Sequence, residues 1–382
     1  MSKIQIISLM DSSPWGGSEV LWYKTSLLLK RLGHQVKVFV KYWQHDLVSG
    51  NVATLNKHGI PVGFWGIPQR PAITLKERIQ RRINRLTQGN EHQKQVFDLD
   101  CDLTIFSSPG NGFDFETIKP FINHKIPYAL IVQSVSESYW PTDSTRESWR
   151  EIYKNARSVF FVSHANAEST QLQLGVNSEN FKVVNNPFQV DGNLPFSWNF
   201  PQDVYNIALV GRLQPEHKGQ DLLFRALARP EWKDRNIKVN VYGRGPAENG
   251  VKAMVDYLSI AEKVHFFGHV DDVSSIWKNN QLLVMPSRHE GLPLAVVEAL
   301  MCGRACLVTD VSGNIEHIED SINGFVAAGP TVNAVNAALN NAWNNRDRWR
   351  EMGEEAYCKI RQKICSDPIT DFVNELLLEI DK

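Results

Sequence analysis

Short apolar runs alternate with helix-length amphipathic segments along most of the chain, and this alternation constrains the fold more than any other feature. Residues 4–9 form the first run, and a loop at 12–18, a helical pattern over 19–32 and a second run at 36–40 follow it. Gly33 ends the helical pattern. Further apolar runs lie at 103–106, 128–132 and 159–162. Continuous apolar strands separated by helices predict a parallel sheet that is covered on both faces.

The pattern breaks at residues 191–203, which contain prolines, a glycine and several asparagines without periodicity, and we predict an interdomain linker there. The alternation then begins again, with apolar runs at 207–211, 237–242, 264–267, 282–285 and 305–309 and helical segments from about 220 and near 251–258, 273–278 and 294–301. We therefore predict an α/β chain of two doubly wound domains that face each other across a cleft. The predicted domains are 1–195 and 203–365, and a C-terminal helix at about 366–382 is expected to pack back on the first domain.

The composition narrows the class of protein. The chain has 382 residues, of which 42% are hydrophobic and 22% charged, so each domain is large enough to bury a core and disorder is not expected. The formal net charge of -1 gives no bulk attraction to nucleic acid. The five cysteines form no CxxC pair, and no signal-peptide pattern or apolar run of membrane-spanning length is present, so we predict reduced thiols in a cytoplasmic protein.

The loop between the first predicted strand and the first predicted helix contains a pair of glycines. In open parallel sheets, ligands bind beyond the carboxyl ends of the strands, where loops and helix N-termini present free backbone N–H groups. Gly16 and Gly17 lie in such a loop, where they would let the backbone approach a diphosphate or a sugar closely. A plain tight turn explains the pair equally well. Their spacing does not match GxGxxG, so the sequence does not support a dinucleotide-binding fingerprint.

The loop 211–219, after the first strand of the second predicted domain, contains two cationic residues. Arg212 and Lys218 bracket a turn that leads into a helix. Two fixed cations in such a place can hold a diphosphate and stabilise the charge that develops on it as it leaves. Two solvated surface cations are the alternative interpretation. The next predicted strand ends in a glycine-rich turn, where Gly243 is either a wall for a nucleotide base or part of a simple strand-to-helix turn.

The segment 288–300 is the most informative motif in the sequence. Glu290 follows a buried run, and a helix whose N–H groups would face the cleft opens directly after it, at Gly291, Leu292 and Pro293. A carboxylate at the loop tip can accept hydrogen bonds from sugar hydroxyls, and one on the helix, at Glu298, can bind a ribose diol. A favourable helix N-terminus would explain Glu290 but not an acidic side chain on the apolar helix face at Glu298.

These motifs resemble those of glycosyltransferase family 4, the retaining enzymes of the GT-B fold that are also described as glycosyl transferases group 1. The family's two glutamates, which seven residues separate, match Glu290 and Glu298, and its phosphate-binding arginine and lysine match Arg212 and Lys218. Its N-terminal diglycine loop, often followed by a glutamate, matches Gly16, Gly17 and Glu19. The resemblance covers nearly the whole chain and is most specific over 205–326.

The resemblance implies an N-terminal acceptor-binding domain and a C-terminal domain that binds a nucleotide sugar, both Rossmann-like. It implies a hexosyltransferase that retains anomeric configuration, needs no metal ion and uses no cofactor besides its donor. We expect UDP-glucose or a related UDP-hexose, although guanine stays open as the base, and an acceptor that is a saccharide or a lipid-linked saccharide of cell-envelope or exopolysaccharide biosynthesis. The residues assigned to catalysis are Arg212, Lys218 and Glu290, and those assigned to substrate binding are Gly16, Gly17, Gln133, Gly243, Gly291, Leu292, Pro293 and Glu298.

Gln133 departs from the family pattern, because many members carry a histidine at the end of the strand that residues 128–132 form. A glutamine cannot act as an acid or base, but it can hydrogen-bond the donor sugar. Two other functions therefore stay open. One is a nucleotide-sugar epimerase of the same architecture, for which the sequence offers no convincing acid–base set, and the other is a non-catalytic binder of nucleotide sugars.

Two further segments have alternative interpretations. Asp98 and Asp100 match the DxD pattern with which other glycosyltransferases hold a metal ion, but they precede a strand, away from the predicted cleft, and a solvated turn is the better interpretation. Residues 76–86 combine five cations with apolar residues at helical spacing. This pattern fits peripheral contact with the inner face of a membrane, although an ordinary surface helix is slightly favoured.

Overall fold

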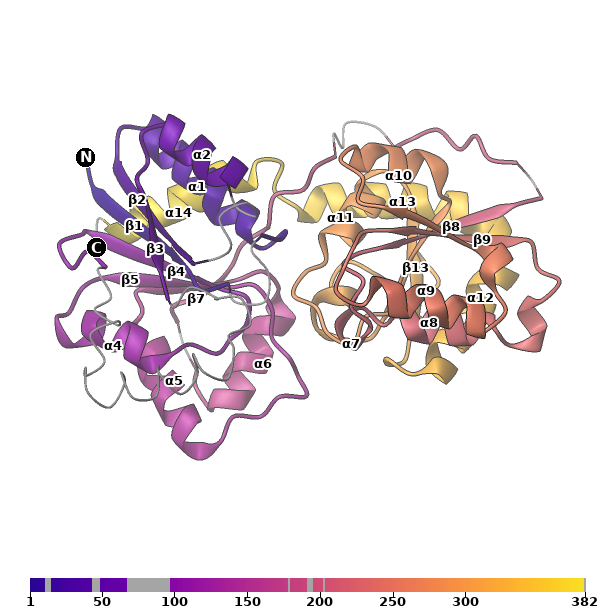
Figure 1. The fold of residues 1–382 in the computed structure, drawn as a ribbon, viewed down its shortest axis with the longest axis horizontal. Coiled ribbons are helices and arrows are strands. Elements are labelled where there is room, and N and C mark those ends of the chain that lie inside the picture. The colour runs from indigo at the N-terminus through magenta and orange to yellow at the C-terminus, as the bar shows by residue number, and fades with distance from the viewer. Residues whose placement is uncertain are drawn as a thin grey trace, which may run out of the picture.

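A computed structural model describes residues 1–10, 15–42, 49–66, 97–177, 179–190, 195–201 and 203–380. The chain forms two α/β domains, each built around its own parallel sheet (Figure 1). The basic segment 76–86 lies outside the described residues. Its predicted contact with a membrane therefore stays a prediction.

The first domain contains a parallel sheet in which seven strands are described, in the order β3-β2-β1-β4-β5-β6-β7. The strands are β1 (Lys3–Ser8), β2 (Gln35–Lys41), β3 (Val62–Trp65), β4 (Leu103–Ser108), β5 (Tyr128–Val132), β6 (Ser158–Phe161) and β7 (Phe181–Val183). The helices are α1 (Glu19–Arg31), α2 (Ser49–Lys57), α4 (Phe115–Asn123), α5 (Asp143–Asn155) and α6 (His164–Leu174). In Figure 1, α1 and α2 cover one face of this sheet and α4 and α5 cover the other.

The second domain contains a parallel sheet in which six strands are described, in the order β10-β9-β8-β11-β12-β13. They are β8 (Tyr205–Val210), β9 (Ile237–Tyr242), β10 (Val264–Gly268), β11 (Leu282–Met285), β12 (Ala305–Thr309) and β13 (Gly324–Ala327). The α-helices are α7 (Pro215–Lys218), α8 (Gln220–Leu227), α9 (Glu248–Tyr257), α10 (Val273–Asn279), α11 (Leu294–Met301), α12 (Val332–Asn344) and α13 (Trp349–Lys363). Short 3-10 turns are η3 (Pro230–Trp232), η4 (Ala261–Lys263), η5 (Ser312–Ile315) and η6 (Arg346–Arg348).

The chain returns to the first domain at its C-terminal end, through α14 (Pro368–Ile380). This helix packs against α1, and both chain ends lie on the first domain in Figure 1. Phe372 meets Phe160 edge to face, with ring centroids 5.0 Å apart. Lys182 of β7 binds two acidic residues of α14, with its Nζ atom 2.6 Å from Glu375 and 2.9 Å from Glu379. Apolar packing and paired charges thus both fix α14 on this domain.

The segment between the two sheets is attached to the second domain over residues 196–200. The buried Arg304 guanidinium donates to the backbone carbonyls of Phe196 and Ser197 at 3.2 Å. It also lies over the rings of Trp198 and Phe200, 5.3 and 5.4 Å from their centroids. Because the guanidinium is delocalised and planar, it satisfies the carbonyls and stacks on the rings at once.

The order of the strands places the sequence motifs at one position in each sheet. In the first sheet β1 lies between β2 and β4, and in the second β8 lies between β9 and β11. The strand order reverses there, so the loops that follow β1, β4, β8 and β11 open a crevice at the carboxyl edge. Gly16, Arg212 and Glu290 follow β1, β8 and β11 respectively.

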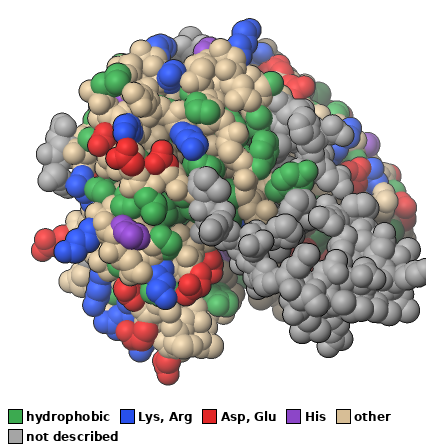
Figure 2. All heavy atoms as spheres, turned by 60° about the vertical axis from the view of Figure 1, so that its left-hand side comes forward, with side chains coloured by type: hydrophobic (Ala, Val, Ile, Leu, Met, Phe, Trp, Pro, Cys, Tyr) green, Lys and Arg blue, Asp and Glu red, His purple; other side chains and the backbone are tan. Residues whose placement is uncertain are grey.

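One face of the molecule shows how its charged side chains are distributed. In Figure 2, acidic and basic side chains are interspersed on the face toward the viewer, as the net charge of -1 leads us to expect. Among the described residues, no helix combines the length and the apolar character needed to cross a membrane. All five cysteines are free thiols, as predicted from the sequence.

Candidate active site at the domain interface

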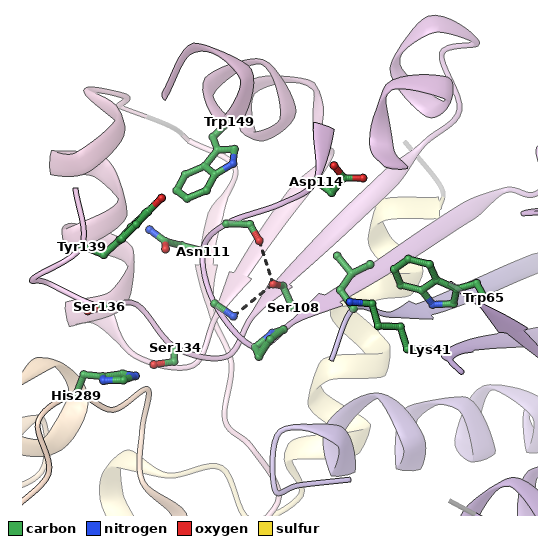
Figure 3. A pocket seen from close by; sticks show the side chains of 14 residues that line it. Lys41, Trp65, Ser108, Asn111, Asp114, Ser134, Ser136, Tyr139, Trp149 and His289 are labelled. Carbon is green, nitrogen blue, oxygen red and sulfur yellow. Dashed lines mark hydrogen bonds between the residues drawn. The ribbon is translucent and has the colours of Figure 1, made fainter. Parts of the chain in front are cut away.

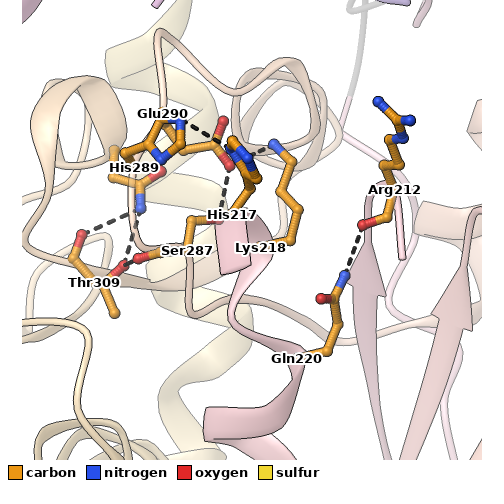
Figure 4. Close-up of polar contacts among 9 residues, drawn as sticks. Arg212, His217, Lys218, Gln220, Ser287, His289, Glu290 and Thr309 are labelled. Carbon is orange, nitrogen blue, oxygen red and sulfur yellow. Dashed lines mark hydrogen bonds and ion pairs between the residues drawn. The ribbon is translucent and has the colours of Figure 1, made fainter. Parts of the chain in front are cut away.

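A short ion pair lies at the centre of the second domain's crevice. The Nζ atom of Lys218, at the end of α7, is 2.6 Å from Oε1 of Glu290, in the loop after β11 (Figure 4). The Ser287 hydroxyl donates to the same carboxylate oxygen at 2.7 Å. Glu290 is only 6% exposed, so the pair is largely removed from water. Two residues that the sequence assigns to the diphosphate and the sugar are therefore neighbours, and one bound group could contact both.

Arg288 links the two loops that contain Lys218 and Glu290. Its backbone N–H donates to the carbonyl of His217 at 2.8 Å. Its guanidinium donates to the carbonyl of Pro215 at 2.6 Å and forms a two-pronged bond with Asp221 at 2.7 and 2.8 Å. A fork of this kind fixes orientation as well as distance. The loops after β8 and β11 are thus held in register independently of Lys218 and Glu290.

Glycines permit the close approach of these loops. Gly219 adopts φ +63°, and a Cβ atom there would lie 1.8 Å from the carbonyl oxygen of Pro286. Gly243 adopts φ +125°, and a Cβ atom there would lie 2.1 Å from the carbonyl oxygen of Gly211. The N–H group of Gly243 is already donated to Gly268 at 2.7 Å. Packing between loops thus requires a glycine at 243, whatever contact it makes with a nucleotide base.

Arg212 does not join the contact between Lys218 and Glu290. Its backbone carbonyl accepts from the Gln220 side chain at 2.8 Å, which ties the first residue after the glycine turn to α8. In Figure 4 the Arg212 guanidinium lies apart from the Lys218 ammonium group, and both side chains extend toward the same side of the loop. Two cations arranged in this way can flank a single anionic group between them.

Glu298 lies on α11, directly behind these loops, and is 6% exposed. One of its carboxylate oxygens accepts the backbone N–H of Gln189 at 3.1 Å. Burial raises the pKa of Glu298 to about 7, and the Gln189 hydrogen bond opposes part of that rise. The helix begins after Pro293, which offers no side-chain cap, so the first N–H groups of α11 are not capped by that residue.

The two domains touch at Gly291. A Cβ atom at Gly291 would lie 1.9 Å from the carbonyl oxygen of Gln133, in the first domain. The carbonyl of Gly291 accepts from the Asn166 side chain of α6 at 3.1 Å, and Asn166 also donates to Ser312 of η5 at 3.1 Å. On the first domain, a Cβ atom at Gly17 would lie 3.4 Å from Leu294 of α11. The fold thus brings the predicted motifs of both domains to one interface.

Gln133 follows β5 and faces this interface with 6% of its surface exposed. Its Oε1 atom accepts from Asn186 at 2.8 Å. Its Nε2 atom has no hydrogen-bond partner among the described residues. A buried amide with an unused donor is costly unless a ligand or water completes it, so Gln133 is suited to a hydroxyl or phosphate oxygen.

Glu19 is used inside the first domain. It is 3% exposed and accepts the Ser8 hydroxyl hydrogen bond at 2.7 Å. Burial raises the pKa of Glu19 to about 7. Its backbone N–H donates to the carbonyl of Gly16 at 3.0 Å. Glu19 therefore ties α1 to the end of β1 and shapes the diglycine loop.

A cavity of about 420 Å³ opens beside this interface, at the carboxyl ends of β1 to β5 (Figure 3). Its walls are aromatic and polar side chains of the first domain, with one residue of the second. Sequence reasoning did not find these residues, since they come from separate strand ends and form no motif. They include Leu9, Lys41, Trp65, Ser108, Asn111, Asp114, Ser134, Ser136, Tyr139, Trp149 and, from the second domain, His289.

A pair of histidines lies between this cavity and the ion pair. Nδ1 of His217 is 3.0 Å from Nε2 of His289, and the ring centroids are 4.4 Å apart. Burial and the neighbouring His217 lower the pKa of His289. Each histidine directly precedes a residue predicted from the sequence, Lys218 or Glu290. Only the fold brings the two rings together.

The DxD segment lies at the opposite edge of the first sheet. Asp100 forms an exposed ion pair with Lys3 at 2.6 Å, at the amino ends of β1 and β4. Over the part of the chain that the structure describes, no group of three or more histidine, cysteine, aspartate or glutamate side chains is arranged to hold a metal ion. Asp98 and Asp100 are thus far from the crevice, as the solvated-turn interpretation expects.

Comparison with known proteins finds sequence similarity over parts of the chain. Residues 191–359 match the sequence model of the family described as glycosyl transferases group 1. The poly(ribitol-phosphate) alpha-N-acetylglucosaminyltransferase of Staphylococcus aureus is 23% identical over 253 residues, which cover 65% of this chain and 50% of that protein. An N,N'-diacetylbacillosaminyl-diphospho-undecaprenol alpha-1,3-N-acetylgalactosaminyltransferase of Campylobacter jejuni is 29% identical over 186 residues, covering 46% of this chain and 48% of that protein. The chain spans about half the length of the curated relatives it matches.

Solved structures resemble the whole chain. HepE of Anabaena in complex with UDP has a TM-score of 0.71 at 17% identity, with 98% of this chain and 99% of HepE covered. TarM has a TM-score of 0.70 at 16% identity, with 100% of this chain and 99% of TarM covered. At these identities the likeness establishes the fold. The predicted GT-B architecture of two Rossmann-like domains is confirmed.

Proposed function

We propose that this GT-B protein, whose residues 191–359 match glycosyl transferases group 1, is a glycosyltransferase that moves a hexose from a nucleotide sugar to a saccharide or lipid-linked saccharide with retention of configuration. One observation carries the proposal. The Lys218–Glu290 pair lies 2.6 Å apart in the crevice of the second domain, next to the cavity of the first. A donor held at the pair would therefore present its sugar to an acceptor in the cavity.

The proposed donor is UDP-glucose or a related UDP-hexose, bound mainly by the second domain. HepE, of the same fold, has been solved with UDP and with UDP-glucose, which supports this choice. In the proposed pose the ribose diol contacts Glu298, and Arg212, Lys218 and the N–H groups of α11 hold the diphosphate. Glu290 and Gly291 hold the hexose, and the unused amide of Gln133 donates to the same sugar. Leu292 and Pro293 place α11 in this pose, and Gly16 and Gly17 border it from the first domain.

The proposed chemistry exchanges one glycosidic bond for another on the same face of the sugar. The bond between the anomeric carbon and the diphosphate oxygen breaks as the acceptor oxygen bonds to that carbon, and the acceptor's proton passes to the departing phosphate oxygen. Arg212 and Lys218 stabilise the negative charge that develops on the leaving group. Closure of the two domains excludes water and so limits hydrolysis of the donor.

The proposal assigns the diphosphate charge to protein cations and helix N–H groups rather than to a metal ion, and it requires no cofactor besides the donor. Turnover is therefore expected to persist in EDTA. The proposed acceptor site is the cavity, whose walls carry aromatic and hydroxyl groups suited to a saccharide. The names of the Staphylococcus and Campylobacter relatives, which specify poly(ribitol-phosphate) and a diphospho-undecaprenol-linked sugar, support a role in cell-envelope or exopolysaccharide biosynthesis. Such a role places the enzyme in the cytoplasm, with peripheral contact at the membrane.

The direct test follows UDP release and sugar isomerisation from UDP-glucose, with and without saccharide acceptors. Lys218→Ala is expected to lower kcat by about 10²-fold, because the departing diphosphate loses a positioned cation. Lys359→Ala, which removes a peripheral lysine whose partner Glu319 is 45% exposed, is the matched control and should turn over normally. Unchanged kcat/KM in Lys218→Ala would remove Lys218 from the site. Isomerisation without UDP release would instead identify an epimerase, and binding of UDP-glucose without either reaction a non-catalytic binder.

A further inference from the structure

We infer that His289 contacts the acceptor saccharide directly and positions its attacking hydroxyl group beside the donor, with His217 fixing the orientation of the His289 ring. This inference rests on the proposed function and adds an acceptor-positioning residue to it. The family motifs do not include either histidine. The argument depends on where His289 lies, on what else holds its loop, and on the chemistry of its free ring nitrogen.

His289 belongs to the second domain but lines the cavity of the first. In Figure 3 its ring extends from the second domain's loop toward Ser134. The next residue along the chain is Glu290, which contacts Lys218 in the proposed donor site. One side chain thus borders both the donor and the acceptor sites. A group in that place is suited to control the distance between the acceptor hydroxyl and the anomeric carbon.

The bond between the two rings is not needed to hold the loops together. Arg288 already binds the opposite loop through its backbone N–H and its guanidinium, at Pro215, His217 and Asp221. Lys218 and Glu290 add a further link. The additional effect of the 3.0 Å contact between Nδ1 of His217 and Nε2 of His289 is therefore on the His289 ring itself, whose rotation it fixes.

The contact also determines which atom of His289 faces a ligand. With Nε2 engaged by His217, Nδ1 is the ring's other hydrogen-bonding atom. If Nε2 accepts the shared hydrogen bond, Nδ1 carries a proton and donates, and if Nε2 donates, Nδ1 accepts. A hydroxyl group both donates and accepts, so it pairs with Nδ1 in either tautomer. A hydroxyl-bearing ligand therefore fits this atom without a change of protonation.

The side chains of the neighbouring cavity wall fit a sugar ring as the ligand that carries this hydroxyl group. The Oγ atom of Ser134 is buried and has no hydrogen-bond partner among the described residues. Tyr139 is 50% exposed and lies against Trp149, with ring centroids 6.0 Å apart and planes tilted by 36°. A pyranose offers hydroxyls at its rim and C–H groups on its face, which complement the unpaired hydroxyl and the aromatic surface respectively.

The test measures transfer from UDP-glucose to a panel of 4-nitrophenyl pyranosides, with donor hydrolysis measured in the same reactions. His289→Ala is expected to raise KM for the best glycoside at least tenfold and to lower the ratio of transfer to hydrolysis. His265→Ala, at an exposed position of β10, is the matched control and should behave as the parent protein. Absence of UDP release by the parent protein contradicts the proposed function, whereas an unchanged transfer ratio in His289→Ala overturns only this inference.

Two conservative variants separate contact with the acceptor from a structural role. The amide of Asn reaches the position of Nδ1, and the amide of Gln reaches the position of Nε2. His289→Asn should therefore recover most of the transfer ratio that His289→Ala loses, and His289→Gln should not. The reverse result would show that only the bond to His217 matters, and would overturn the inference. If the parent protein neither binds nor glycosylates any pyranoside of the panel, by ligand-observed NMR and product analysis, the acceptor chemistry assigned here is wrong.

Discussion

The crevice of the second domain contains two buried carboxyl groups, those of Glu290 and Glu298. Glu290 is stabilised by an ammonium group and a hydroxyl group, whereas Glu298 accepts the backbone N–H of Gln189. Burial raises the pKa of Glu298 to about 7, so its ionised form is less favourable in the folded protein than in water. A carboxylate in this position can accept hydrogen bonds from a ligand, such as those of ribose hydroxyls. Its burial reduces the stability of the ligand-free protein.

Glu298→Gln is expected to stabilise the free protein at pH 8 but not at pH 4.5. The folded-state pKa of about 7 lies above the ordinary value of 4.5, so the folded chain binds more protons between these values and loses stability as pH rises through them. This loss of folding stability is complete above pH 7 and amounts to about 3 kcal/mol. Urea unfolding at both pH values measures this loss, and Glu248→Gln, on a partly exposed helix position paired with Lys252, is the control. An equal effect of Glu298→Gln at pH 4.5 and pH 8 would contradict this account.

Sequence reasoning finds individual residues where the chemistry is local in the chain. Lys218 and Glu290 each lie in a recognisable loop, and their assignment to one site needs only the rule that strand ends meet at one edge. His289 and the cavity wall could not be found in this way, because five strands supply their neighbours. Gly243 is the reverse case. The sequence suggests contact between this glycine and a nucleotide base, whereas the fold requires a glycine there because two loops pack closely together.

At the scale of elements, the central strands were predictable, whereas of the edge strands only β10 was predicted, at 264–267. β5, β9, β11 and β12 have the predicted bounds. β5, β11 and β12 are apolar runs buried on both faces, and β9 is buried at all but one of its positions. β3, β7 and β13 were not predicted. They are short, lie at the sheet edges and contain glycine or lysine, so burial does not impose an apolar pattern on them. The motif loops follow central strands, which is why the site was more predictable than the sheet edges.

A buried charge, together with apolar packing, holds α14 on the first domain. Glu379 is fully buried and pairs with Lys182, whose side chain is 30% exposed. Lys182→Ala should destabilise the protein by about 3 kcal/mol, because it leaves a buried carboxylate without its cation. Lys359→Ala breaks a more exposed pair and should cost less than about 1 kcal/mol. Thermal and urea unfolding compare the two variants, and equal costs would mean that α14 is held by apolar packing alone.

At the scale of the whole molecule, the domains meet through a few specific contacts. The backbone N–H of Ser312 donates to Glu137 at 2.8 Å, and the backbone N–H of His164 donates to Glu316 at 3.1 Å. Together with Asn166 and Gly291, these bonds define one relative placement of the two crevices. Because contacts of this kind can break and reform, opening to admit the donor and closing for transfer are compatible with them.

Gly291→Ala tests whether this placement is required for transfer. The added Cβ atom would lie 1.9 Å from the Gln133 carbonyl oxygen and 2.9 Å from a methyl group of Val162, so the domains must separate to admit it. Since a displacement of about 1 Å at a reacting centre can cost about 10²-fold in rate, kcat for transfer is expected to fall by that order. Affinity for UDP should change little, because the nucleotide is assigned to Glu298 and the cations rather than to this contact. Gly250→Ala is the matched control: Gly250 lies in α9, and no atom of the described residues lies within 4 Å of the added Cβ. The change should leave turnover intact and add about 0.5–1 kcal/mol of stability. Small-angle scattering should show a larger radius of gyration for Gly291→Ala alone. An unchanged radius with normal transfer would mean that the contact at Gly291 is not part of the reacting arrangement.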